Sequence, residues 1–123
     1  MYSELINRKS EQNELLDWAT EIAVNLKREN VSKEELRRIV LFAHEHQDNV
    51  DNTITYIMRQ AQKLDFKDSG KILVNRIQSL KNNPNDIIIL LHYIQWIFET
   101  IERKPINYKT RKFIDLVNQV KKR

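Results

Sequence analysis

Apolar residues recur along the chain at the three-to-four-residue spacing of amphipathic helices. The pattern predicts a short N-terminal turn around Leu5 and Ile6, after which Ser10 is expected to cap a helix over about residues 11–29. The apolar stripe expected on that helix consists of Leu15, Ala19, Ile22, Ala23 and Leu26. Acids crowd its first turns and Lys27 and Arg28 its last, as the helix dipole favours.

The segment Ser32-Lys33-Glu34-Glu35 has the form of a capping box. In such a box the serine oxygen accepts the N–H of the glutamate, and the glutamate side chain reaches back to the serine N–H. It predicts a helix through about His46 with a buried stripe of Leu36, Ile39, Val40 and Ala43. After the polar residues 47–49, a third helix is expected over about 50–64, facing inward with Ile54, Ile57, Met58 and Ala61.

Polar caps predict where the next two helices begin. Asp68 or Ser69 is expected to cap a helix over about 70–80, whose inward residues are Leu73, Ile77 and Leu80. Because Pro84 disfavours helical backbone at the residue before it, Asn85 is the predicted N-cap of a fifth helix over about 86–103.

The predicted fifth helix is apolar nearly all round. A helix of that kind is either the central helix of a bundle or has a second face for a partner. The central position is favoured, with Trp96 in the core. Pro105 ends this helix, and a last one is expected over about 109–122, presenting Phe113, Ile114, Leu116, Val117 and Val120.

Short connections between these helices predict antiparallel packing of neighbours. We therefore expect an all-α fold, a compact bundle of five to six mostly antiparallel helices that forms a single domain over residues 1–123. The chain has one Gly and two Pro, far too few for the turns of sandwiches, barrels or doubly wound sheets. The same scarcity excludes glycine-rich phosphate loops and dinucleotide fingerprints.

Cysteine usage and hydropathy exclude further classes of protein. The chain has no cysteine, which removes disulfides, thiolate metal sites and a thiol nucleophile. Its N-terminus lacks the basic region and long apolar run of a signal peptide, and its longest apolar run, residues 87–91, is far short of a membrane span. We expect a cytoplasmic protein with no membrane partner.

Charge is distributed unevenly along the sequence. The net charge is +4, but residues 1–66 hold 9 Lys or Arg against 12 Asp or Glu, whereas residues 67–123 hold 12 against 5. An acidic and a basic half indicate a basic end that meets an anionic partner. A solvated surface whose charges happen to segregate is the alternative.

Candidate catalytic and metal-binding groups are few. His44 and Asp48 share one helical face at i, i+4, but two ligands do not complete a metal site, so no metal and no cofactor are predicted. Arg38 and His44, with five residues between them, are similar in spacing to the motif of the HEPN ribonucleases, all-α dimers in which Arg and His would activate the 2′-OH of RNA and stabilise the cleaved phosphate. That resemblance implies an enzymatic alternative; otherwise the chain is expected not to be an enzyme.

The basic residues form the main candidate binding site. Several charges spread along a groove are what a phosphate backbone needs, with little further geometry. Tyr56 and Tyr108 are candidates for stacking on bases. The predicted nucleic-acid-binding residues are Lys33, Arg37, Arg38, Arg59, Lys63, Lys67, Arg103, Lys104, Lys109, Arg111 and Lys112.

Residues 32–104 resemble the small helical subunits of type III CRISPR interference complexes. The resemblance is carried by Ser32-Lys33-Glu34-Glu35-Leu36-Arg37, by Tyr56-Ile57-Met58-Arg59 and by the aromatic stretch 91–99. It implies a non-catalytic subunit that stacks with its copies as a filament and holds a guide–target duplex by charge alone. By motif match, the family's binding role reaches Lys33, Arg37 and Arg59.

The leading expectation is therefore a non-catalytic helical subunit of a ribonucleoprotein complex. Its expected partners are RNA or single-stranded nucleic acid, other subunits of the complex and, by self-association, its own copies. The first alternative is a protein-interaction module that uses the apolar excess of residues 86–101. The second is the ribonuclease that would act through Arg38 and His44.

Overall fold

The computed structural model describes residues 2–121, with side chains from residue 13 onward. Six helices make up the regular structure of this range. They are α1 (Tyr2–Arg28), α2 (Lys33–Glu45), α3 (Val50–Lys63), α4 (Lys67–Ser79), α5 (Pro84–Ile101) and α6 (Phe113–Lys121). No strand occurs in this range, so the predicted all-α helical bundle is confirmed.

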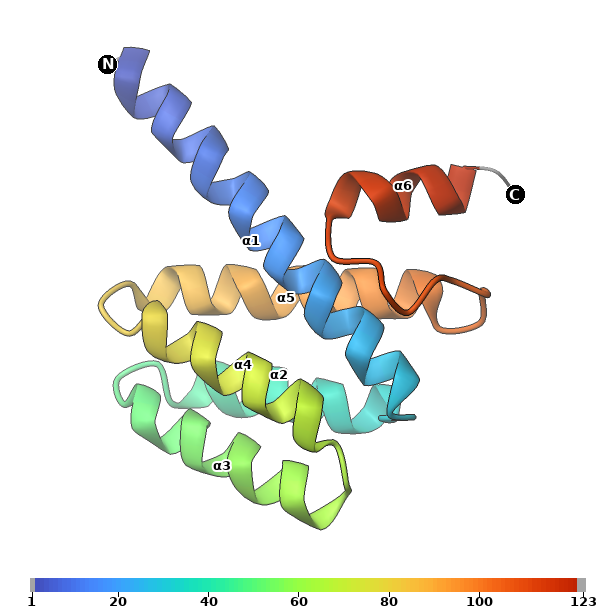
Figure 1. Ribbon diagram of the computed structural model, residues 1–123. Coiled ribbons are helices and arrows are strands. Elements are labelled where there is room, and N and C mark those ends of the chain that lie inside the picture. The colour runs from blue at the N-terminus through green and yellow to red at the C-terminus, as the bar shows by residue number, and fades with distance from the viewer. Residues whose placement is uncertain (1, 122–123) are drawn as a thin grey trace.

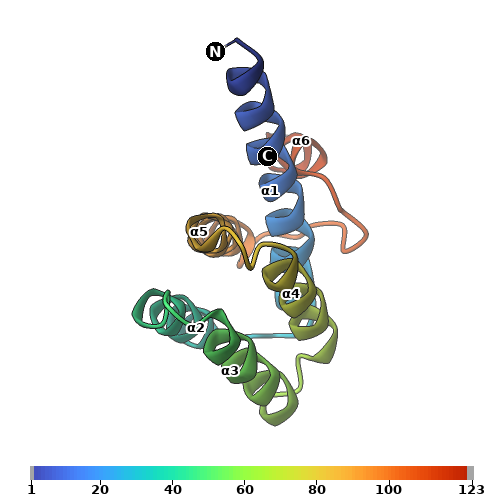
Figure 2. The ribbon, with the colours of Figure 1, turned by 90° about the vertical axis from the view of Figure 1, so that its left-hand side faces the viewer.

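Helix α1, which packs against α4, α5 and α6, has more helical neighbours than α5, the helix that was expected at the centre. Helix α5 keeps an exposed face at Ile89 and Trp96. It packs against α1 on one side and α2 on the other, and α1 crosses it obliquely (Figure 1). Helices α2, α3 and α4 alternate in direction and follow one another below α5, with α4 also contacting α1 (Figure 2). Helix α6 packs on α1, and the N-terminal turns of α1 project beyond the other helices (Figure 1).

The core contains the predicted stripes of the first two long helices in full and the later ones in part, since Leu80 is half-buried and Ile114 is 60% exposed. All nine predicted inward residues of the first two long helices are buried: Leu15, Ala19, Ile22, Ala23, Leu26, Leu36, Ile39, Val40 and Ala43. Met58 and Trp96 were predicted to be buried and are each 59% exposed. On α3 the buried positions are Thr53, Ile54, Ile57 and Ala61, so Met58 lies at the margin of the buried stripe. On α5 the buried arc passes through Ile94, Ile97 and Phe98, which leaves Trp96 on the outer face.

The predicted break before Glu11 is absent. Helix α1 runs without interruption from Tyr2 through Ser10, so the expected N-terminal turn and the cap at Ser10 are both wrong. No glycine or proline occurs in this segment, and an interior serine costs a helix only a few tenths of a kcal/mol. A continuous helix is therefore the more stable arrangement.

Two helices end at a left-handed residue that is not glycine. Asn30 after α1 and Asp65 after α3 each adopt the left-handed conformation, with φ of 60°. The Val31 N–H then bonds to the Leu26 carbonyl, and the Phe66 N–H bonds to the Ala61 carbonyl. These six-to-one bonds are the mark of the Schellman motif, which satisfies carbonyls at the ends of both helices.

The beginnings of the later helices were predicted several residues off. Helix α4 starts at Lys67, not 70, so Asp68 and Ser69 lie inside it and are not its caps. Helix α5 starts at Pro84 with Asn83, not Asn85, as the cap residue, because proline suits the first helical position, where no N–H is needed. Helix α6 starts at Phe113, not 109, because Asn107 folds the preceding residues into a turn by accepting the N–H of Lys109 at 2.8 Å.

Candidate nucleic-acid interface

The eleven predicted cations fall into three separate groups. Lys33, Arg37 and Arg38 lie on α2, Arg59, Lys63 and Lys67 on α3 and the start of α4, and the other five in the connection 102–112. Figure 2 places α2 and that connection on opposite sides of the molecule. The residues carried by the family resemblance, Lys33, Arg37 and Arg59, do not share one helix or one face with the basic C-terminal segment.

The arginines of α2 are engaged with acids. Arg37 lies 3.4 Å from the carboxylate of Glu99 on α5. Arg38 lies 3.3 Å from Glu35, whose side chain is only 2% exposed and also accepts a hydrogen bond from Gln60 at 3.0 Å. Ser32 accepts the Glu35 N–H at 3.0 Å, so the first bond of the predicted capping box is present. The Glu35 carboxylate bonds Arg38 and Gln60 in place of the Ser32 N–H. Two of these cations therefore have structural partners.

Four cations line a cleft between the last turns of α1, the first turns of α4 and the connection 102–112. We call it the basic cleft. Its volume is about 460 Å³. It is lined by Asn25, Arg28, Asp68, Lys71, Ile72, Tyr108, Lys109 and Arg111, so four cations face one acid.

Hydrogen bonds fix two of the four cations in place. Arg28 bonds the buried Asn25 amide oxygen at 2.9 Å and forms a 2.9 Å ion pair with Asp68. Arg111 donates to the carbonyl oxygens of Tyr108 and Thr110 at 3.1 Å, and its Nε lies 3.6 Å from Glu21. Both guanidinium groups keep partly exposed edges, with side-chain exposures of 39% and 51%.

The other two cations face the cleft as exposed ammonium groups. Lys71 and Lys109 form no ion pair with any residue of the described part of the chain. Lys67 lies one helical turn before Lys71 on α4 and borders the adjoining depression between α3 and α4. Positive charge thus continues from the cleft along α4, and Tyr108, 46% exposed, adds an aromatic ring at the edge.

The connection 102–112 is held rigidly although it lacks helical structure. The Lys27 ammonium donates to the Glu102 carbonyl at 2.9 Å, which fastens its start to the end of α1. Gln119 of α6 bonds the buried Thr110 hydroxyl at 2.7 Å and the Asn107 N–H at 2.8 Å. The sequence between these anchors therefore presents Tyr108, Lys109 and Arg111 in fixed positions.

A carboxylate from α1's C-terminal end holds the α4 wall of the cleft. Glu29 accepts the N–H of Asp68 at 3.2 Å and that of Ser69 at 2.7 Å, and also the Ser69 hydroxyl. A negative group at this position satisfies two free amides and complements the positive end of the helix dipole. The cap predicted from Asp68 or Ser69 is thus supplied by a residue distant in sequence.

Sequence reasoning identified half of the cleft cations. Lys109, Arg111 and the stacking candidate Tyr108 were predicted, whereas Arg28 and Lys71 were not. Arg28 has an adequate local explanation as a C-terminal helix cation, and Lys71 follows Lys67 at i, i+4, which is the one signal that could have indicated it. Tyr56, the other stacking candidate, has one ring face against Phe42, with ring centres 4.4 Å apart, and burial raises the pKa of its hydroxyl.

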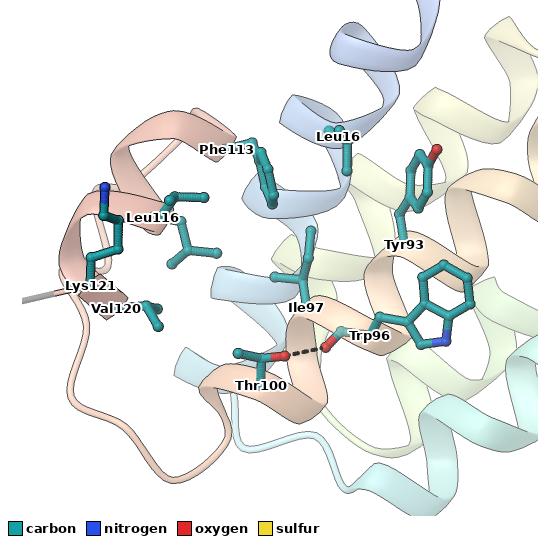
Figure 3. A pocket seen from close by; sticks show the side chains of 10 residues that line it. Leu16, Tyr93, Trp96, Ile97, Thr100, Phe113, Leu116, Val120 and Lys121 are labelled. Carbon is teal, nitrogen blue, oxygen red and sulfur yellow. Dashed lines mark hydrogen bonds between the residues drawn. The ribbon is translucent and has the colours of Figure 1, made fainter. Parts of the chain in front are cut away.

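A second depression is almost wholly apolar and lies between α5, α6 and α1 (Figure 3). We call it the apolar groove. Its volume is about 370 Å³, and Trp96 stands at its edge while Ile97 lies buried at its base. It is lined by Leu16, Tyr93, Trp96, Ile97, Thr100, Phe113, Leu116, Val117, Val120 and Lys121.

The histidines have partners other than those considered from sequence. His44 meets His92 of α5, with 2.9 Å between their Nε2 atoms, and no bond joins it to Asp48. No hydrogen bond or ion pair connects His44 with Arg38 within the described residues, and six positions place the two side chains about 120° apart around the helix. The geometry therefore gives the ribonuclease alternative no support.

Comparison of the chain with protein-family models, with curated proteins and with solved structures found no match. None of the described helices combines the length and the apolar character that crossing a bilayer requires.

Proposed function

We propose that this chain is a non-catalytic protein that binds single-stranded nucleic acid through the basic cleft without reading its sequence. The observation that carries the proposal is the meeting of Arg28, Lys71, Lys109 and Arg111 around one depression in which Asp68 is the only acid. These four residues come from three elements, so the fold brings together charges that are far apart in sequence.

Charge and aromatic character both favour this class of ligand. Cationic grooves follow a phosphate backbone with little geometric demand, and an exposed aromatic ring can stack on any base. Tyr108 stands next to Lys109 and close to Arg111 in the same connection. The cleft has the size range of small-molecule and nucleotide sites, and its lining is polar enough to receive a sugar-phosphate unit.

The resemblance of residues 32–104 to small subunits of type III CRISPR complexes extends the proposal. In that setting the protein acts in the cytoplasm as one non-catalytic subunit of a ribonucleoprotein complex. Within the described residues, Lys71 and Lys109 of the basic cleft form no ion pair, whereas Arg37 and Arg38 of α2 both do, so we assign backbone contact to the basic cleft and not to α2. Lys67 continues the positive surface along α4, whereas Arg59 and Lys63 lie on α3 outside the proposed contact.

Binding of a fluorescent single-stranded RNA, measured from about 50 to 200 mM salt, tests this function. With three phosphate contacts, from Lys71, Lys109 and Arg111, log K should fall against log salt with a slope of about −2, since Asp68 neutralises Arg28. The double variant K71E/K109E should bind at least about tenfold more weakly, with a shallower slope.

The matched control is R59E/K63E, which changes the net charge equally on exposed cations of α3. It should weaken binding by only about twofold, through the general field of the protein. Absence of binding at low salt, or equal weakening by the two double variants, would contradict the assignment to the basic cleft.

Self-association through the apolar groove is a second candidate function, favoured by the exposure of Trp96. A tryptophan 59% exposed at the edge of an apolar groove is both a projecting group and part of a receiving site. Two copies related by a twofold axis can each insert Trp96 into the groove of the other, which is the self-complementary geometry of symmetric dimers. The half-buried Val117 and Val120 would then lose their remaining solvent contact.

Sedimentation of nuclease-treated protein tests this second function. The wild type should form a dimer, and W96A should shift it to monomer, since a central tryptophan commonly contributes about 2 kcal/mol or more to an interface. The control is M58A, because Met58 is equally exposed but lies on α3, away from the groove. A monomeric wild type, or a W96A protein that still dimerises, would exclude groove-mediated self-association.

A further inference from the structure

Two histidines from different helices meet on the outer face of the α2–α5 pair. The Nε2 atoms of His44 and His92 are 2.9 Å apart, and their rings are inclined by 64° with centres 5.0 Å apart. The antiparallel register that pairs these residues also pairs Arg37 with Glu99 seven residues away on each helix. The two imidazoles are therefore held together by the packing of the helices.

The separation of the two nitrogen atoms suits a metal ion as well as a shared hydrogen bond. Two nitrogens at about 2.05 Å from one ion lie about 2.9 Å apart when their bonds form a right angle, and about 3.3 Å apart at the tetrahedral angle. The observed distance of 2.9 Å is that of the hydrogen bond between the two rings, and small rotations of the rings bring both nitrogens to one ion. Among divalent first-row ions, nitrogen ligands hold Cu²⁺ and Ni²⁺ more tightly than Co²⁺, Fe²⁺ or Mn²⁺.

We propose that His44 and His92 form a two-imidazole chelate for a borderline divalent transition-metal ion, Cu²⁺ or Ni²⁺. His44 is exposed and His92 half-buried, so an ion reaches the pair from solvent. No third His, Cys, Asp or Glu in the described part of the chain joins them, so the pair binds an exchangeable ion with water in the remaining positions and is not the completed site of a resident metal. Hard ions such as Mg²⁺ prefer oxygen ligands and are not bound. This site is independent of the nucleic-acid function.

Trp96 provides a local reporter of this site. Its ring centre lies 5.7 Å from that of His92, one helical turn away on α5. The other of the chain's two tryptophans, Trp18, lies under Arg76 with 4.4 Å between the guanidinium carbon and the ring centre. Paramagnetic Cu²⁺ bound by the histidine pair should therefore quench Trp96 fluorescence strongly.

Titration of the untagged full chain with CuCl₂ and NiCl₂ at low micromolar protein concentration is the test. The W18F background isolates the emission of Trp96, which both ions should quench and a chelator should restore. H44Q or H92Q should each raise the half-quenching concentration by about tenfold or more, because a single imidazole loses the advantage of the chelate. MgCl₂ should cause no change.

The control is H46Q, which removes the chain's third histidine. His46 Nδ1 lies 2.9 Å from the Phe42 carbonyl and its ring stacks on Phe42, so it belongs to a different cluster. Thermal unfolding gives a second measurement: saturating Ni²⁺ should raise the midpoint of the wild type and of H46Q by about 5 °C, and that of H44Q and H92Q by much less. Quenching and stabilisation that survive in H44Q or H92Q, or their absence from the wild type, would overturn the proposal.

Discussion

The single glycine of the chain lies at a close crossing of α3 and α4. A methyl group added at Gly70 would come within 2.5 Å of the Ala61 Cβ, closer than two carbon atoms can approach. Gly70 is buried in α4, and Ala61 faces it from α3. The small side chains of Gly70 and Ala61 thus allow α3 and α4 to lie close together. This distance also sets the position of α4, which forms one wall of the basic cleft.

Replacing Gly70 with alanine should destabilise the protein by about 1–2 kcal/mol. Alanine favours helix over glycine by about 1 kcal/mol, but forcing an extra methyl group into a packed contact costs about 1–3 kcal/mol and displaces backbone here. Urea unfolding of G70A measures the difference.

The double variant G70A/A61G supplies the control, because removing the Ala61 methyl group vacates the space that the new one needs. It should be more stable than the sum of the two single changes predicts by about 1 kcal/mol. Additive effects, or a G70A protein as stable as the wild type, would show that the two helices are not in tight contact at this point.

At the scale of whole elements, apolar periodicity predicted every helix that the structure contains but not where several begin. The stripes of α1 and α2 are buried because each forms the single apolar face of its helix, and that face is stable only when it packs against other helices. The errors at Met58 and Trp96 differ: Met58 lies at the margin of the buried stripe of α3, whereas Trp96 lies opposite the buried stripe of α5, a helix that is apolar nearly all round. Sequence alone does not show which margin a neighbouring helix covers.

Two of the mispredicted helix beginnings, those of α4 and α6, are capped by groups that are distant in sequence. Glu29 at the end of α1 bonds the first free amides of α4, and Asp17 of α1 accepts the Phe113 N–H at the start of α6 at 2.9 Å. Local capping rules examine residues within a few positions of the helix. They succeed at α2, whose cap Ser32 is local, and fail at α4 and α6, whose caps come from α1.

At the scale of the whole molecule, net charge by sequence half was only a partial guide to the binding surface. Residues 1–66 are acidic overall, yet Arg28 contributes to the basic cleft from that half. The basic half supplied Lys71, Lys109 and Arg111. The set of cations that converge depends on how α1, α4 and the connection 102–112 meet. The exposed arginines of α2, in contrast, pair with Glu99 of α5 and with Glu35 of α2 itself.

The lone acid of the basic cleft gives the proposed function a test by gain of affinity. Asp68 neutralises Arg28 at 2.9 Å, so D68N should free one cation for phosphate while keeping the Asp68 N–H that bonds Glu29. RNA affinity should rise about threefold, and the salt slope should steepen by about 0.7, the value for one added contact with a single strand.

The control for D68N is D51N, because Asp51 also neutralises one exposed cation, Lys81, at 3.0 Å. Asp68 lies in the first turn of α4 and Lys81 lies beyond its last, so the length of that helix, roughly 20 Å, separates the two pairs. That distance is about twice the screening length at 0.1 M salt. D51N changes net charge identically, so a rise in affinity confined to D68N would locate binding at the basic cleft. An equal rise in both variants, or none in D68N, would mean that RNA responds to overall charge or binds elsewhere.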